Sequence, residues 1–135
     1  MADLNGLELS EAGTLLLGGS RALRAGPFVD LYRGGYKVTF TISIPQKRAL
    51  PDAPICSVRV TDFNVETVYA EEDVAGSAFI GGQKAEVTLY FYTKASHYTR
   101  FQVLPADSQE LEITGIRYQK ISRTATEFKK VIQTQ

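Results

Sequence analysis

The sequence has 135 residues, the size of a single domain with one sizeable hydrophobic core. Lys and Arg balance Asp and Glu at fifteen each, so no overall field draws the protein to nucleic acid, and we expect no nucleic-acid partner. The single cysteine, Cys56, excludes an internal disulfide framework and a cysteine-rich zinc site.

The first part of the chain predicts short strands separated by glycine and proline turns. Apolar and polar residues alternate over residues 36–44, which gives the clearest strand. Residues 45–54 hold three prolines and predict a surface loop. Further strands are predicted at residues 7–9, 14–17, 28–31, 55–61, 65–70 and 77–80, with an acidic loop at residues 71–73.

Residues 85–104 predict two half-buried strands joined as a hairpin through residues 93–97. With that five-residue connection, three outward pairs face one another: Tyr92 with Tyr98, Tyr90 with Arg100, and Thr88 with Gln102. The only histidine, His97, is then expected at the tip of the loop.

The end of the chain predicts a closing strand and then a helix. The alternation of residues 111–118 shifts at Gly115, which indicates a β-bulge. Residues 124–135 have apolar residues at helical spacing, which predicts a short helix packed on the sandwich or the start of a linker.

Eight or nine short strands with glycine and proline turns predict an all-β fold, an antiparallel β-sandwich or jelly roll, with a short C-terminal helix. We expect the sandwich domain to cover residues 1–122 and residues 123–135 to form a tail. An immunoglobulin-like sandwich is the alternative, although the sequence lacks the cysteine pair and the tryptophan of antibody-type domains.

Two segments, GPFVDLYRGGYKVTFTISI at residues 26–44 and TRFQVLPADSQELEITGIRYQKI at residues 99–121, resemble the galactose-binding-like jelly rolls of carbohydrate-binding modules. These segments look in particular like the small β-sandwich modules attached to bacterial glycosyltransferases and other polysaccharide-handling proteins. The resemblance implies a lectin-like, non-catalytic domain that places aromatic side chains against sugar rings. It also implies a glycan or polysaccharide partner and a tethered catalytic domain in a larger chain.

The sequence departs from that pattern in two respects. It has no tryptophan, so any stacking on sugar falls to tyrosine or phenylalanine. Many such modules hold a structural calcium, and here only Asp3, Glu8 and Glu11 together with Glu112 could close a calcium site. Scattered carboxylates are usually solvated, so we expect no cofactor and leave structural calcium open.

The predicted ligand-binding residues are Tyr90, Tyr92, Tyr98, Arg100, Gln102 and His97. Aromatic faces beside a few hydrogen-bonding groups are typical of a small-ligand site. The alternative is that cross-strand tyrosine pairs only stabilise a sheet, and that a loop histidine is only solvated. Lys37, Thr39 and Thr41 join the same face if their strand belongs to the same sheet.

No catalytic constellation is apparent, and we expect no enzyme activity. A lone histidine with no cysteine partner argues against a zinc centre or a catalytic triad. The adjacent carboxylates at residues 71–73 do not suit a glycosidase pair, which needs separation across the substrate. The other function left open is a structural or assembly domain, of phage-tail or surface-protein type, that uses the same face for protein contacts.

The sequence does not assign a compartment. No apolar run reaches the roughly 20 residues of a membrane span. The N-terminus has neither a basic region nor a long apolar core, so we expect no signal peptide. The protein is therefore expected to be either cytoplasmic or a piece of a longer chain.

Overall fold

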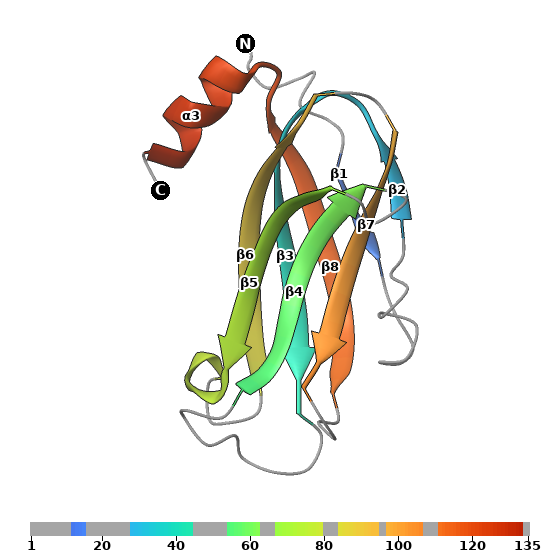
Figure 1. The fold of residues 1–135 in the computed structure, drawn as a ribbon, viewed down its shortest axis with the longest axis vertical. Helices are drawn as coiled ribbons and strands as arrows, with labels where there is room; N and C mark the ends of the chain where they lie inside the picture. The colour runs from blue at the N-terminus through green and yellow to red at the C-terminus, as the bar shows by residue number, and fades with distance from the viewer. Residues whose placement is uncertain are drawn as a thin grey trace.

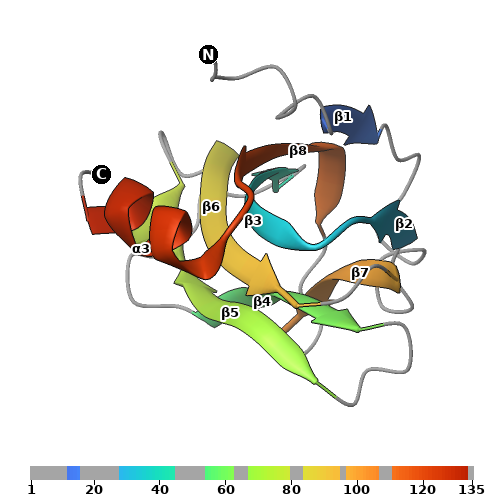
Figure 2. The same ribbon diagram turned by 90° about the horizontal axis from the view of Figure 1, so that it is seen from above.

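A computed structural model describes residues 12–15, 28–44, 54–62, 67–79, 84–94, 97–106 and 111–133. The described residues form eight strands in two four-stranded antiparallel sheets and one C-terminal helix (Figure 1). The first sheet has the order β1 (Ala12–Leu15), β8 (Glu112–Ser122), β3 (Gly34–Ser43), β6 (Lys84–Thr93). The second has the order β2 (Phe28–Leu31), β7 (His97–Pro105), β4 (Pro54–Asp62), β5 (Val68–Ala75). Seen end-on, the sheets form two layers, which confirms the predicted antiparallel β-sandwich (Figure 2).

The predicted hairpin over residues 85–104 is wrong, because its two strands belong to different sheets. Strand β6 pairs with β3, whereas β7 pairs with β2 and β4. Both strands nevertheless alternate as predicted and turn their apolar residues into the same core. The alternation of apolar residues is satisfied equally by a hairpin and by a chain that crosses from one sheet to the other, so it could not decide the pairing.

Aromatic side chains from both sheets fill the space between them. The Phe101 ring of β7 lies 6.3 Å from the Phe40 ring of β3 in an edge-to-face arrangement. Within the first sheet, Tyr36 of β3 and Phe91 of β6 stack with ring centroids 5.5 Å apart. These four side chains are almost completely buried, so the sandwich is held by packing across the two sheets as well as by strand pairing.

The strand boundaries agree with the predictions at most positions. The strands predicted at residues 28–31, 36–44 and 55–61 are confirmed, as is the bulge at Gly115, where the register of β8 on β3 shifts. The acidic residues 71–73 lie inside β5 and not in a loop, because β5 begins later and runs further than predicted. Residues 76–78 form a 3₁₀ turn where a strand was predicted. The predicted strand at residues 7–9 and the proline-rich residues 45–53 lie outside the described residues.

The predicted C-terminal helix is confirmed as α3 (Ala125–Gln133), and it packs on the sandwich. A capping box begins it: the backbone N–H of Glu127 donates to Thr124 Oγ1 at 3.1 Å, and the backbone N–H of Thr124 donates to Glu127 Oε1 at 3.4 Å. The ring of Phe128 lies 6.0 Å from that of Tyr92 on β6. It covers Gly35, where a Cβ atom would collide with the Phe128 ring. Within the part of the chain that is described, no helix is long and apolar enough to cross a membrane.

Candidate functional site

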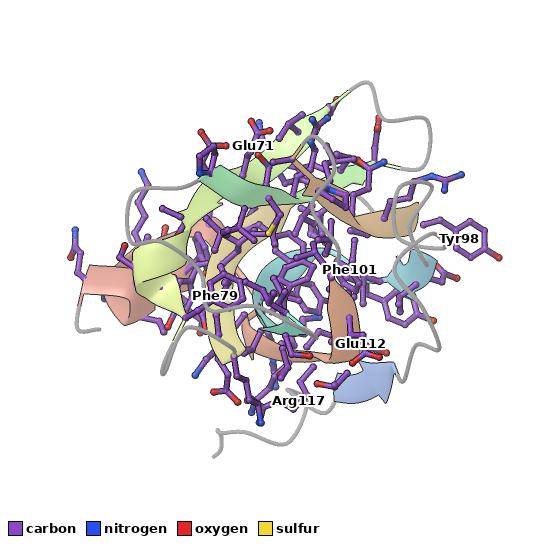
Figure 3. All side chains as sticks on the ribbon, turned by 90° about the horizontal axis from the view of Figure 1, so that it is seen from below. Glu71, Phe79, Tyr98, Phe101, Glu112 and Arg117 are labelled. Atoms are coloured by element: carbon purple, nitrogen blue, oxygen red, sulfur yellow. The ribbon has the colours of Figure 1, made fainter. Side chains whose placement is uncertain are left out.

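The predicted ligand-binding residues do not share one surface. Tyr90 and Tyr92 alternate with the buried Phe91 of β6, while Tyr98, Arg100 and Gln102 alternate with the buried Phe101 of β7. Because Phe91 and Phe101 both point into the core between the sheets, the two sets lie on opposite outer faces of the molecule. In Figure 3, Arg117 of the first sheet and Glu71 of the second lie on opposite sides of Phe101.

The outer face of the first sheet carries Tyr90 among polar side chains that engage one another. Lys37 lies opposite Tyr90, so β3 does share this face, as expected. The hydroxyls of Thr39 and Thr88 lie 3.0 Å apart in a cross-strand hydrogen bond. Arg117 Nη2 lies 3.6 Å from Glu86 Oε2. Tyr90 is half-buried, so this face offers little free aromatic surface.

Polar side chains also contact one another on the middle of the outer face of the second sheet. Arg59 Nε lies 3.3 Å from Glu71 Oε2, and Ser57 Oγ donates to Asp73 Oδ1 at 2.7 Å. The side chain of Gln102 is only 6% exposed and lies opposite Arg59. Gln102 therefore presents little surface to a ligand.

The exposed aromatic surface lies at the edge of the second sheet, where β2 meets β7. Tyr32 is 64% exposed and Tyr98 is 48% exposed, more than any other large apolar side chain of the described residues. Asp30 lies opposite Tyr98 in the register of β2 on β7, and Tyr32 directly follows β2. Arg100 lies two residues from Tyr98 along β7. We call Asp30, Tyr32, Tyr98 and Arg100 the tyrosine edge; Figure 3 shows Tyr98 pointing away from the molecule at this position.

Buried neighbours fix the backbone of the tyrosine edge. Leu31 and Thr99, which adjoin the two tyrosines, are both buried. The Tyr36 hydroxyl donates to the carbonyl oxygen of Tyr32 at 2.7 Å. Two residues on, Gly34 takes φ +154°, a conformation that residues with a side chain rarely adopt. The tyrosine rings are thus carried on a backbone that is already ordered, which lowers the entropic cost of binding.

Tyr32 was not among the predicted site residues, because all of these were taken from the segment at residues 85–104. A signal was present in the sequence: Tyr32 stands between a predicted strand and the Arg-Gly-Gly turn. At that position a large ring lies outside the apolar alternation of the strand and is not directed into the core. His97 is not at a loop tip as predicted but opens β7, opposite Leu31, since the predicted hairpin does not exist. Its side chain lies outside what the structure describes.

Two further candidates contribute nothing to this site. Within the described ranges, no three His, Cys, Asp or Glu side chains are grouped so as to hold a metal ion. Of the carboxylates considered for calcium, Asp3, Glu8 and Glu11 lie outside those ranges, and Glu112 is exposed on β8. Cys56 is buried in the core, and its burial raises the pKa of the thiol to about 12. The thiol is therefore neutral and unreactive near pH 7.

No protein-family model matches the chain, and no curated protein is similar to it. Solved structures that resemble it include the carbohydrate-binding module CBM6cm-2 of Cellvibrio mixtus lichenase 5A, in complex with cellotriose. That match has 14% sequence identity and a TM-score of 0.47, over 73% of this chain and 68% of the module. The C-terminal CBM6 of the marine laminarinase LamC from Zobellia galactanivorans matches with 17% identity and a TM-score of 0.45, over 83% of this chain and 93% of the module. Both are carbohydrate-binding modules, the class that the sequence resembles.

Proposed function

We propose that this protein is a non-catalytic carbohydrate-binding domain that holds a sugar against the tyrosine edge. The observation that carries the proposal is the exposure of Tyr32 and Tyr98 on an ordered backbone beside two charged hydrogen-bonding groups. A tyrosine ring packs against the C–H face of a pyranose, while the Asp30 carboxylate accepts hydrogen bonds from hydroxyls and the Arg100 guanidinium donates them. This pairing of apolar rings with a few polar groups is what a small-ligand site requires.

The expected affinity is modest. Covering about 60 Å² of each ring by a sugar stabilises the complex by about 1.5 kcal/mol per ring, at about 25 cal/mol per Å². Two rings and a few hydrogen bonds must offset the cost of association, which leaves a dissociation constant of about 0.1–1 mM. A domain of this affinity acts by tethering: it raises the local concentration of a polysaccharide near a catalytic domain in the same larger protein.

The proposal is tested on a glycan array with four proteins: the wild type, Tyr32→Ala, Tyr98→Ala and Tyr90→Ala. Circular dichroism first establishes that all four are folded. Tyr90→Ala is the matched control, because it removes a tyrosine from the opposite outer face. We expect Tyr32→Ala and Tyr98→Ala each to weaken binding about tenfold, corresponding to the loss of one ring contact, with Tyr90→Ala unchanged. Loss in Tyr90→Ala alone would move the site to the first sheet, and binding to no glycan would overturn the proposal.

The alternative that was left open, an assembly domain, uses the same exposed rings for contact between proteins. It predicts that the wild type self-associates and that Tyr98→Ala restores a monomer, because tyrosine anchors often dominate interfaces. Size-exclusion chromatography with light scattering distinguishes the two functions. A monomeric wild type at high concentration contradicts the self-assembly form of the alternative.

A further inference from the structure

Two exposed cations lie at the end of the sandwich that carries the tyrosine edge. In the register of β3 on β6, Gly34 lies opposite Thr93. The next residues outward are Arg33, which directly follows Tyr32, and Lys94. Both side chains are exposed, and among the described residues neither takes part in an ion pair.

Further charged side chains of both signs surround these two cations. The turn from β2 to β3, the last residue of β6, the first residue of β7 and helix α3 all lie at the same end of the molecule (Figure 1). Helix α3 adds the exposed Lys129 and Lys130. Two of the described carboxylates there accept hydrogen bonds from the backbone. Glu127 accepts from the N–H groups of Arg123 and Thr124 at the start of the helix. Asp62 accepts from the N–H group of Thr67 at 3.1 Å. Asp30, opposite Tyr98, belongs to the tyrosine edge itself.

Two like charges that lie one residue beyond a pair of opposed strand ends repel each other. The chain has no net charge, so the excess of cations at this end is a local feature and not a consequence of composition. An anion placed between Arg33 and Lys94 removes the repulsion and gains charge-assisted hydrogen bonds from both. A guanidinium is well suited to this role, since it binds carboxylate, sulfate or phosphate oxygens in a bidentate fashion.

We propose that the glycan bound by this domain is anionic, and that Arg33 and Lys94 bind its carboxylate, sulfate or phosphate group. The inference rests on the proposed function, because it assigns the class of sugar held at the tyrosine edge. A sugar stacked on Tyr32 has its substituents next to Arg33, which adjoins Tyr32 in the chain. Stacking on Tyr32 thereby favours a sugar ring as the ligand, and the two cations favour a sugar that carries a negative charge.

The test uses an array that pairs uronic-acid and sulfated oligosaccharides with their neutral parents, for example oligogalacturonate with its methyl ester. The proteins are the wild type, Arg33→Gln, Lys94→Gln and the control Lys84→Gln. Lys84 opens β6 and Lys94 follows its last residue, so the control removes an exposed cation about 33 Å away on the same strand. Thermal unfolding of each variant confirms that the fold is retained, and relief of the repulsion predicts an equal or slightly higher Tm for Arg33→Gln and Lys94→Gln.

We expect the anionic member of a pair to bind at least about tenfold more tightly than its neutral parent. Arg33→Gln and Lys94→Gln should each weaken that binding by about three- to tenfold, and Lys84→Gln should not. Raising NaCl from about 50 to about 500 mM should weaken binding of the anionic member and leave that of the neutral member nearly unchanged.

The remaining outcomes separate this inference from the proposed function. If neutral and anionic members bind equally and Arg33→Gln has no effect, the domain binds glycans but the inference is wrong. If no glycan binds while citrate shifts the NMR signals of Arg33 and Lys94, the two cations do bind an anion, but the carbohydrate function and the assignment of an anionic glycan are both wrong. If neither glycan nor citrate binds, both are overturned.

Discussion

Replacing Phe101 by alanine should destabilise the protein more than any change at its surface. The Phe101 side chain is 0% exposed, and its ring lies 6.3 Å from that of Phe40 and 5.9 Å from that of Tyr118. It therefore joins β7 of one sheet to β3 and β8 of the other. Truncation removes these contacts and leaves a cavity that the two sheets cannot fully close, at a cost of about 3–5 kcal/mol in the free energy of unfolding. Of the roughly 5–15 kcal/mol that stabilises a typical domain, that is about a fifth or more.

Urea unfolding followed by far-UV circular dichroism measures this loss. Phe101→Leu keeps part of the apolar volume and loses the ring contacts, so it should cost about 1–2 kcal/mol. Tyr98→Ala, on the outward side of the same strand, should change the free energy of unfolding by no more than about 0.5 kcal/mol. A loss below about 1.5 kcal/mol for Phe101→Ala, or one equal to that of Tyr98→Ala, would refute the account of a core packed between the two sheets.

Three further predictions follow from the described contacts. Gly34→Ala should lower the free energy of unfolding by about 1–3 kcal/mol, because φ is +154° there and a Cβ would lie 2.7 Å from the Ser122 carbonyl oxygen; an unchanged urea midpoint would contradict this. Phe128→Ala should release α3 from Tyr92, seen as faster amide hydrogen exchange throughout the helix, and unaltered exchange would show that the helix is held by other contacts. Burial raises the pKa of the Cys56 thiol from 9.0 to about 12, so the thiol loses its proton at lower pH in the unfolded state than in the folded state. The contribution of this thiol to stability is therefore fully present below pH 9. Between pH 9 and about 12, the free energy of unfolding falls by up to about 1.4 kcal/mol per pH unit. Cys56→Ala should lack that part of the pH dependence, and parallel curves for the two proteins would disprove it.

The sequence was sufficient to predict most strands because each carries its own signal. Strand β3 shows strict alternation, and Gly115 shifts the phase of β8 where the register on β3 shifts. Helical spacing of Phe128, Val131 and Ile132 likewise predicts α3. All of these signals are local, and each depends on residues that are neighbours in the chain.

The pairing of strands, and with it the site, could not be obtained in the same way. Tyr92 and Tyr98 are six positions apart in sequence and were expected to face each other across a hairpin, yet they lie in different sheets. The choice between a hairpin and a crossing depends on β3 and β4, which pair with these strands from distant parts of the sequence. The candidate site consequently retains Tyr98 and Arg100 from the prediction and gains Tyr32, whose proximity to them only the pairing of β2 with β7 reveals.

The most direct test of the carbohydrate-binding account is an NMR titration of the isotopically labelled wild type with the best ligand from the glycan array. The account predicts saturable shifts of backbone amides in Asp30 to Arg33 and Tyr98 to Arg100, the two segments that form the tyrosine edge. It also predicts that the amides of Lys37, Tyr90 and Arg117, on the opposite outer face, remain unshifted. Shifts confined to that opposite face would contradict the account.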